Sequence, residues 1–307
     1  MAVESSAVAA PRLNWTGLAL AMLGAIGFSG KAIIVKLAYR HGVDAVTLLM
    51  WRMLLALPFF LAMAWWSGRG KPALTRRDWR DIAVLGFTGY YLASYLDFAG
   101  LAYISASLER LILYLNPTLV LLLSVVFFHH RLQARQVLAL AISYAGVVAV
   151  FAHELSFDGR STVIGAALVF ASAISYAVYL ALSGKVVQRL GSLRLAGLAS
   201  SVACALCIGQ FLLVKPLAAA WVPTPVMWLS LLNSTACTVA PVLMVMLAIA
   251  RIGAPLSSQV GMVGPMSTLI MGVLILGEPM NGWIALGTVL VLGGVFLVGL
   301  KPAARPG

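Results

Sequence analysis

The sequence predicts an all-α integral membrane protein of ten transmembrane helices, arranged as two inverted five-helix repeats. Its composition, its long apolar runs and an internal duplication predict this fold. Hydrophobic residues make up 62% of the 307 residues, charged residues make up 10%, and the mean hydropathy is +1.00. A soluble domain has about 45–50% apolar and about 25% charged residues. Because a water-soluble core cannot hold so much apolar surface, we expect the chain to lie in a lipid bilayer.

The apolar runs predict helices, because backbone groups in lipid must be paired within the segment and the runs lack the alternation of a barrel strand. The first run, from Trp15, is too long for a signal peptide, and we expect it to be a retained first span. We predict ten spans, at about 15–38, 45–66, 80–102, 106–128, 132–151, 163–183, 194–214, 226–250, 254–276 and 282–300.

An internal duplication relates the two halves at an offset of 148 residues. Moving the segment 254–298 back by this offset places Pro265 on Pro117 and Gly294 on Gly146, and several apolar residues also coincide. Proline and glycine in phase with helix ends are less expected by chance than matching leucines. Because each copy has an odd number of spans, five, the second copy enters the membrane from the opposite side.

The duplication predicts five segments. These are a cytoplasmic N-terminal tail at 1–14, a first five-helix repeat at 15–151, an extracytoplasmic linker at 152–162, a second repeat at 163–300 and a cytoplasmic C-terminal tail at 301–307.

Basic residues accumulate in cytoplasmic loops, which tests the number and direction of the spans. With the N-terminus inside, fourteen of the 21 basic residues fall on the cytoplasmic face, including the cluster between Arg69 and Arg80. We therefore expect a multi-pass protein of a bacterial inner membrane with both termini in the cytoplasm. The net charge of +12 then reflects contact with anionic lipid and not with nucleic acid. The oligomeric state is left open, with a monomer as the simplest expectation.

Ionisable residues at membrane depth are candidates for function, because a charge near the bilayer centre costs at least about 2.5–3.5 kcal/mol. They are Lys31, Arg52, Asp97, Glu109 and Arg110. Their signs predict pairing of Lys31 or Arg52 with Asp97 or Glu109. The alternative is a structural ion pair or side chains that reach the outer headgroups, and this is the favoured interpretation for Glu109 and Arg110.

Two stripes of aromatic and hydroxyl side chains predict a cavity that stacks a planar or amphipathic substrate. The third span carries Tyr91, Tyr95 and Phe98 on one helical face, and the sixth carries Tyr176 and Tyr179 among serines. The alternative for these tyrosines is packing between helices or an interfacial belt.

Flexible or broken helices are needed for alternating access, and glycine and proline supply them. We expect hinges at Gly30, Pro117, Gly264 and Pro265, although glycines at this spacing also serve close helix packing. Freed carbonyls and the polar side chains of Asn116, Ser258 and Gln259 are candidates to bind a substrate's ammonium or carboxylate.

Enzyme motifs are not evident in the sequence. Neither a paired acidic metal motif nor a nucleophile motif with a usable histidine is present, and the four histidines lie at span ends or in loops. Cys204, Cys207 and Cys237 lie in apolar runs without His or acidic neighbours, as expected of small core residues. We therefore expect no catalytic residue, metal or cofactor.

The motifs from Leu247 to Gly294 resemble the second repeat of EamA-type exporters of the drug/metabolite transporter superfamily. They are LAIARIGAPLSSQ, a Gly-Pro pair in the next span, LGEP at its end and GxxxxxxGG in the last span. Lys36, Arg52 and Tyr176 stand where that family often has a lysine, an arginine and an aromatic residue. One difference is that His129 or His130 replaces, in the first repeat, the glutamate that Glu278 supplies in the second.

The resemblance implies ten spans around a central cavity and export of amino acids or other small metabolites. The tyrosines make the aromatic amino-acid exporters the branch that it resembles most. A different small solute, such as a nucleotide sugar, a purine or a cationic drug, is the alternative cargo, and a membrane-embedded enzyme is the alternative class. Buried Lys31 and Arg52 balance Asp97, which favours a zwitterion over a cation.

Overall fold

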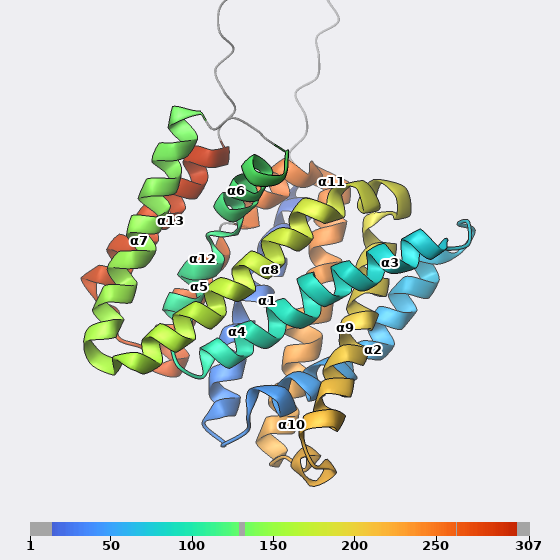
Figure 1. The fold of residues 1–307 in the computed structure, drawn as a ribbon, viewed down its shortest axis with the longest axis horizontal. Coiled ribbons are helices and arrows are strands. Elements are labelled where there is room, and N and C mark those ends of the chain that lie inside the picture. The colour runs from blue at the N-terminus through green and yellow to red at the C-terminus, as the bar shows by residue number, and fades with distance from the viewer. Residues whose placement is uncertain (1–13, 129–132, 262, 300–307) are drawn as a thin grey trace, which may run out of the picture.

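The computed structural model describes residues 14–128, 133–261 and 263–299, and Figure 1 shows them as a bundle of helices. No strand occurs among these residues. The first half contains α1 (Trp15–Tyr39), α2 (Ala45–Gly68), α3 (Arg76–Leu85), the π-helical turn η1 (Gly86–Leu92), α4 (Ala93–Leu101), α5 (Ala106–Leu113), α6 (Asn116–Phe128) and α7 (Ala134–Asp158). The second contains α8 (Arg160–Leu190), α9 (Ser192–Val214), η2 (Leu217–Ala220), α10 (Thr224–Ser234), η3 (Thr235–Val239), α11 (Ala240–Gly261), α12 (Val263–Met271), η4 (Gly272–Leu276) and α13 (Gly282–Gly299).

These elements form ten helical passes in the described part of the chain. Seven helices are long and apolar enough to cross a membrane: Trp15–Tyr39, Ala45–Gly68, Ala106–Leu123, Ala134–Ser156, Arg160–Leu190, Ser192–Val214 and Thr224–Gly253. The third pass combines α3, η1 and α4, and begins with charged residues. The ninth and tenth contain the shorter apolar helices Val263–Leu276 and Gly282–Leu297. The all-helical membrane fold predicted from the sequence is confirmed.

Side-chain caps begin several helices at the predicted turns. Asn14 accepts the N–H of Gly17 at the start of α1, and Thr75 and Asp78 form a capping box at the start of α3. Asp44 caps α2 and also pairs with Lys215 at 3.1 Å. Partial burial alone would raise the pKa of Asp44, but hydrogen bonds from Thr47 and Lys215 hold that pKa below its ordinary value.

Two connections between helices are shorter in the structure than the sequence predicts. The segment predicted as a linker, 152–162, is helical except at Gly159, where a φ of +55° turns the chain between α7 and α8. Only glycine adopts such a conformation without strain, so a single residue replaces a longer loop. Gly253 acts similarly: its φ of +79° breaks α11 between the eighth and ninth passes.

Each half packs against the other through equivalent helices. The second and seventh passes (α2 and α9) pack together, as do the fifth and tenth (α7 and α13). The third pass packs on the sixth through α4 and α8, and the first packs on the eighth through α1 and α11. Exchanging the halves leaves this set of pairs unchanged, as a pseudo-two-fold axis requires.

Close contacts repeat at the 148-residue offset. A Cβ placed on Gly17 would lie 2.5 Å from Ile252, and one placed on Gly165 would lie 2.7 Å from Ile104. The two glycines are 148 positions apart, and so are the two isoleucines. The duplication read from the sequence is therefore also a duplication of contacts.

A second set of equivalent contacts involves backbone carbonyls. Ser175 donates a hydrogen bond of 2.7 Å to the carbonyl of Thr88. At the equivalent place, a Cβ on Gly27 would lie 2.9 Å from the carbonyl of Ala236. The two π-helical turns, η1 and η3, also occupy equivalent places in the third and eighth passes. Because a π turn widens the helix, each exposes carbonyls that a small residue of the facing helix can approach.

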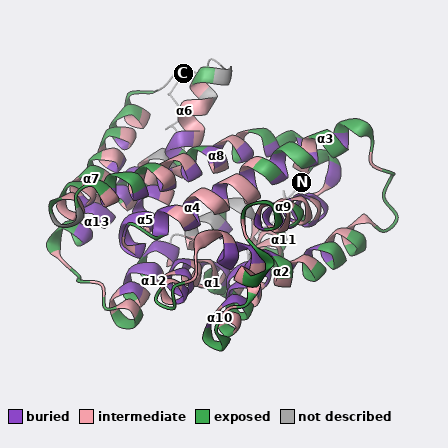
Figure 2. Ribbon diagram, turned by 60° about the horizontal axis from the view of Figure 1, so that its bottom comes forward, coloured by how far each residue is buried: buried purple, intermediate pink, exposed green. Residues whose placement is uncertain are grey.

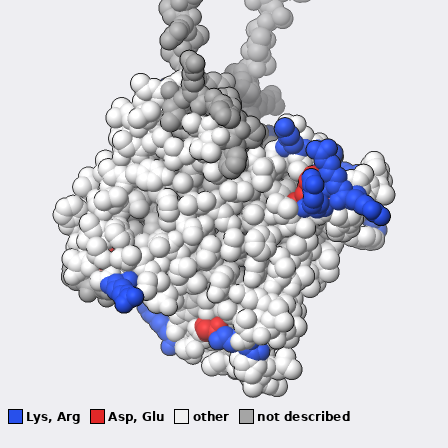
Figure 3. Space-filling model, in the orientation of Figure 1, with Lys and Arg blue, Asp and Glu red and all other residues white. Residues whose placement is uncertain are grey.

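The outer surface is apolar, as expected for contact with lipid. Large hydrophobic side chains are exposed there, among them Trp66 (77%), Leu213 (87%) and Trp221 (90%). Figure 2 shows the buried faces of the helices turned inward and the exposed faces turned outward. Figure 3 shows that charged side chains gather at a few places near the ends of the molecule and leave the rest of the visible surface uncharged.

Candidate functional site

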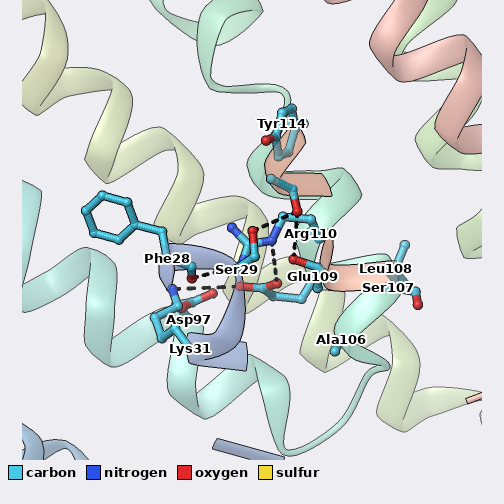
Figure 4. Close-up of polar contacts among 12 residues, drawn as sticks. Phe28, Ser29, Lys31, Asp97, Ala106, Ser107, Leu108, Glu109, Arg110 and Tyr114 are labelled. Atoms are coloured by element: carbon cyan, nitrogen blue, oxygen red, sulfur yellow. Dashed lines mark hydrogen bonds and ion pairs between the residues drawn. The ribbon is translucent and has the colours of Figure 1, made fainter. Parts of the chain in front are cut away.

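Four charged side chains meet inside the first half, where α1, α4 and α5 join (Figure 4). Lys31 Nζ lies 2.5 Å from Asp97 Oδ2 and 3.8 Å from Glu109 Oε1. Arg110 Nε lies 3.8 Å from Glu109 Oε2. Asp97 is 2% exposed and Glu109 is fully buried. We call Lys31, Asp97, Glu109 and Arg110 the charged cluster.

The charged cluster matches the pairing that the sequence predicts and resolves one alternative. Lys31 is the cation that pairs with both carboxylates. Glu109 does not reach the headgroups, because its carboxylate faces Lys31 and Arg110 inside the protein. Burial without partners would cost each ion several kcal/mol, so mutual pairing is what allows these residues to stay at this depth.

Arg52 lies beside the charged cluster but has different partners. Its Nε donates a hydrogen bond of 2.9 Å to Thr238 Oγ1, and its guanidinium lies over the ring of Phe98, 5.2 Å from the ring centre. The residue is 6% exposed, and its Nη1 has no hydrogen-bond partner among the described residues. Such a buried donor is costly to leave unpaired, which makes it available to an anionic group.

The fourth pass is interrupted near the charged cluster. The fourth pass breaks between α5 and α6, and Asn116 and Pro117 are the first two residues of α6. In the ninth pass, Gly264 and Pro265 lie within the helix α12 (Val263–Met271). Interrupted helices around a central site are typical of transporters.

Hydrogen bonds tie the ninth pass to the first and fourth passes. Ser29 donates to the carbonyl of Gly264 at 2.7 Å, and Tyr114 donates to the carbonyl of Gly261 at 3.4 Å. A Cβ on Gly264 would lie 2.8 Å from Tyr114 Oη, and one on Gly30 would lie 2.9 Å from the sulfur of Cys237. Both glycines therefore allow close packing in this conformation, and their role as hinges stays a prediction.

The polar candidates of the fourth and ninth passes are only partly described. Asn116 Oδ1 is buried without a hydrogen-bond partner among the described residues, and so is Ser257 Oγ. The side chains of Ser258 and Gln259 lie outside the described part of the structure, as do His129 and His130.

The two tyrosine stripes do not face each other. The rings of Tyr176 and Tyr179 in α8 stack with their centres 5.4 Å apart. The hydroxyl of Tyr179 lies 3.1 Å from the hydroxyl of Tyr90. Tyr91 and Tyr95 pack instead against a buried core to which α1, α2, α4 and α9 contribute and which contains Phe98. Sequence reasoning missed Tyr90. The adjacent Gly89 was the available signal, because Tyr179 fills the space that a side chain there would need.

Tyr95 lines a groove of about 550 Å³. Its walls come from α4, α8, the end of α1 and the start of α2. Tyr39 and Tyr103 also line it, together with Asp44. By the predicted orientation it lies on the extracytoplasmic side. Its aromatic lining begins where the Tyr91–Tyr95 stripe ends.

Glu278 has a structural partner that the sequence did not reveal. Its carboxylate accepts the N–H groups of Ala106 at 2.7 Å and Ser107 at 3.2 Å, and the Ser107 hydroxyl at 2.6 Å. An acidic group at a helix N-terminus satisfies donors that have no partner within the helix. Glu278 therefore joins the end of the ninth pass to the start of α5.

Comparison with known proteins identifies the family. The EamA-like transporter family matches the chain twice, at residues 15–152 and 163–300. The chain belongs to the EamA-like transporter family. These two matches are related by the same offset of 148 residues as the repeated contacts.

Similar proteins carry transporter names. "Uncharacterized transporter YcbK" of Bacillus subtilis (strain 168) is 29% identical over 294 residues, which is 92% of this chain and 91% of that protein. "Uncharacterized transporter YetK" of the same organism is 24% identical over 301 residues, covering 94% and 90%. A solved crystal structure that is 17% identical superposes with a TM-score of 0.61 over 92% of this chain and 96% of that one, which shows a shared fold.

Proposed function

We propose that this EamA-family chain exports amino acids, in particular aromatic or hydrophobic ones, by alternating access between its two inverted halves. The observation that carries the proposal is the meeting of buried charges of both signs at the charged cluster and Arg52. A zwitterion brings one ammonium and one carboxylate, so it can replace internal partners without changing the net charge of the site. A substrate of a single sign would leave a buried charge unpaired, which is strongly unfavourable.

Two atoms are the proposed anchors for such a substrate. Asp97 Oδ2 contacts Lys31, whereas Asp97 Oδ1 has no hydrogen-bond partner among the described residues. Arg52 Nη1 is likewise without one in the described part. We assign Asp97 Oδ1 to the substrate's ammonium and Arg52 Nη1 to its carboxylate, since charge-assisted hydrogen bonds are the strongest that a buried site offers.

The preference for an aromatic or hydrophobic side chain rests on what surrounds these anchors. Tyr91, Tyr95 and Phe98 share one face of the third pass, and Phe98 already stacks under the guanidinium of Arg52. A planar side chain gains contact area and ring stacking on such a surface. Tyr179 packs on Tyr90 and Tyr176 stacks on Tyr179, so we assign these two residues an indirect role in holding the third and sixth passes together.

We further propose a bacterial inner membrane location with both termini in the cytoplasm. The distribution of Lys and Arg supports this direction. In this orientation Glu278 and the groove at Tyr95 lie toward the outside, and the break between α5 and α6 lies deeper in the membrane.

Counterflow into proteoliposomes tests the proposal. Purified protein is reconstituted with unlabelled tyrosine inside, and uptake of labelled tyrosine is compared with uptake of tyramine, which lacks the carboxylate. The wild type is expected to exchange tyrosine at least about tenfold faster than tyramine, because tyramine leaves Arg52 unpaired. Arg52→Gln should reduce this preference, and Arg160→Gln, which removes the same charge at an exposed position, should leave it unchanged. Exchange of a nucleotide sugar, purine or cationic drug with none of tyrosine would refute the proposal, and absence of any flux would favour an enzyme.

A further inference from the structure

A second groove, of about 310 Å³, lies between α3 and α8. It is at the opposite end of the molecule from the 550 Å³ groove that Tyr95 lines. Its rim carries the basic side chains of Arg77, Arg80, Lys185 and Arg189. Figure 3 shows basic side chains gathered over this end of α3, around a small acidic patch. We call this feature the α3–α8 groove.

The α3–α8 groove changes from basic to apolar along its length. Arg77 and Arg80 are in the first turns of α3, and Val84 lies one turn further into the molecule. On α8, Lys185 lies near the helix end, and Leu182 lies one turn before it. Because the two helices run in opposite directions, their basic ends coincide. Their apolar walls also coincide, and Val84 and Leu182 are 45% and 48% exposed.

Arg189 holds this groove in shape. Its Nη2 lies 2.8 Å from Asp78 Oδ1 and 2.9 Å from Asp81 Oδ2, so it links α8 to the start of α3. The two carboxylates offset the charge of Arg189. Arg77 and Lys185 are both exposed, and they have no ion pair among the described residues. The uncompensated charge of the rim therefore comes mainly from these two residues.

We propose that the α3–α8 groove binds the headgroup of an anionic glycerophospholipid of the cytoplasmic leaflet. Arg77 and Lys185 contact the phosphate, and Val84 and Leu182 contact the first part of an acyl chain. A free phosphate would match the rim but leave the apolar walls in contact with water. Basic pockets between transmembrane helices on the cytoplasmic side have the chemistry that anionic lipid headgroups require.

The position of the α3–α8 groove gives this lipid a structural role. α3 belongs to the first repeat and α8 to the second, and the third and sixth passes pack together. A lipid bound between them bridges the two halves at the cytoplasmic end. The inference does not depend on which solute is transported.

Native mass spectrometry of the full-length protein in mild detergent tests this proposal. Dioleoylphosphatidylglycerol is titrated against the wild type and the double variant Arg77→Gln/Lys185→Gln, with dioleoylphosphatidylcholine as the zwitterionic comparison. The matched control, Arg160→Gln/Arg251→Gln, removes the same charge from exposed positions outside the groove. Both groove residues are exposed and without ion pairs in the described part, so their replacement should leave the fold intact; gel filtration and the number of bound phosphatidylcholine molecules check this.

The groove variant is expected to bind phosphatidylglycerol at least about tenfold more weakly than the wild type, with the control unchanged. Equal affinity of the wild type and the groove variant would overturn the proposal. An equal loss in the control would also overturn it, because it would reflect net charge alone. A third overturning result is that glycerol phosphate displaces phosphatidylglycerol from the wild type at equal concentration, since the site would then recognise a free anion.

Discussion

Replacing Lys31 by methionine should destabilise the protein more than any other single change in the charged cluster. Lys31 Nζ lies 2.5 Å from Asp97 and 3.8 Å from Glu109, and the change leaves Asp97 buried without this cation and Glu109 with Arg110 alone. At an effective dielectric constant of about 20, unit charges at these distances attract by roughly 6–7 and roughly 4 kcal/mol. Desolvation offsets much of this, and breaking a buried pair costs about 3–5 kcal/mol in net terms.

The structure also predicts how much each variant loses in free energy of unfolding relative to the others. Asp97→Asn should cost less than Lys31→Met, because Lys31 keeps Glu109 as a partner. The double variant Lys31→Met/Asp97→Asn should cost less than the sum of the two single changes, by about 2 kcal/mol. Lys215→Met is the control: its pair with Asp44 is 3.1 Å long but has side chains 33% and 42% exposed, so its loss should cost less than about 1 kcal/mol.

Reversible unfolding of the purified protein in mixed micelles, followed by tryptophan fluorescence, measures these free energies. Additive costs in the double variant would refute the reasoning, because they would mean that Lys31 and Asp97 do not stabilise each other. A cost for Lys31→Met no greater than that for Lys215→Met would refute it as well.

Three further predictions concern packing, capping and pH. Gly27→Val should lower the yield of monodisperse protein in gel filtration, because a Cβ there would already lie 2.7 Å from Pro241; a normal yield would contradict the packing. Glu278→Gln should weaken the cap on α5 by about 1–2 kcal/mol and speed hydrogen exchange of residues 106–113, and unchanged exchange would argue against that cap. The lowered pKa of Asp44 means that its pairing stabilises the fold above about pH 4 and that this contribution is lost as the pH falls through the folded-state pKa. Asp44→Asn should therefore flatten the acid limb of a stability-versus-pH curve, and an unchanged limb would contradict the assignment.

The fold could be predicted from the sequence because its signals are physical constraints on a chain in lipid. Unbroken apolar runs fix the passes, and basic loops indicate their direction. The duplication was visible because Pro117 and Pro265 stand at equivalent positions of the fourth and ninth passes, and the same offset recurs in the contacts of Gly17 and Gly165. The opposite charges at membrane depth also required partners, so the pairing of Lys31 could be expected in outline.

Other features depend on contacts that the sequence does not encode locally. Helical periodicity of 3.6 residues places Tyr91 and Tyr95 on one face, but it does not show that the wide turn of η1 directs Tyr90 toward Tyr179. The partners of Glu278 lie more than 170 positions earlier in the chain, so only the folded structure brings them together.

Substituted-cysteine labelling in cells tests most directly the claim that the two repeats are inverted in the membrane. Ala73 and Ala218 are exposed in equivalent loops, after the second pass of each repeat, and each is replaced by cysteine in a background without the three buried native cysteines. We predict that a membrane-impermeant maleimide labels Ala218→Cys in intact cells and labels Ala73→Cys only after permeabilisation. Labelling of both positions from the same side would contradict the inverted arrangement and the transport mechanism built on it.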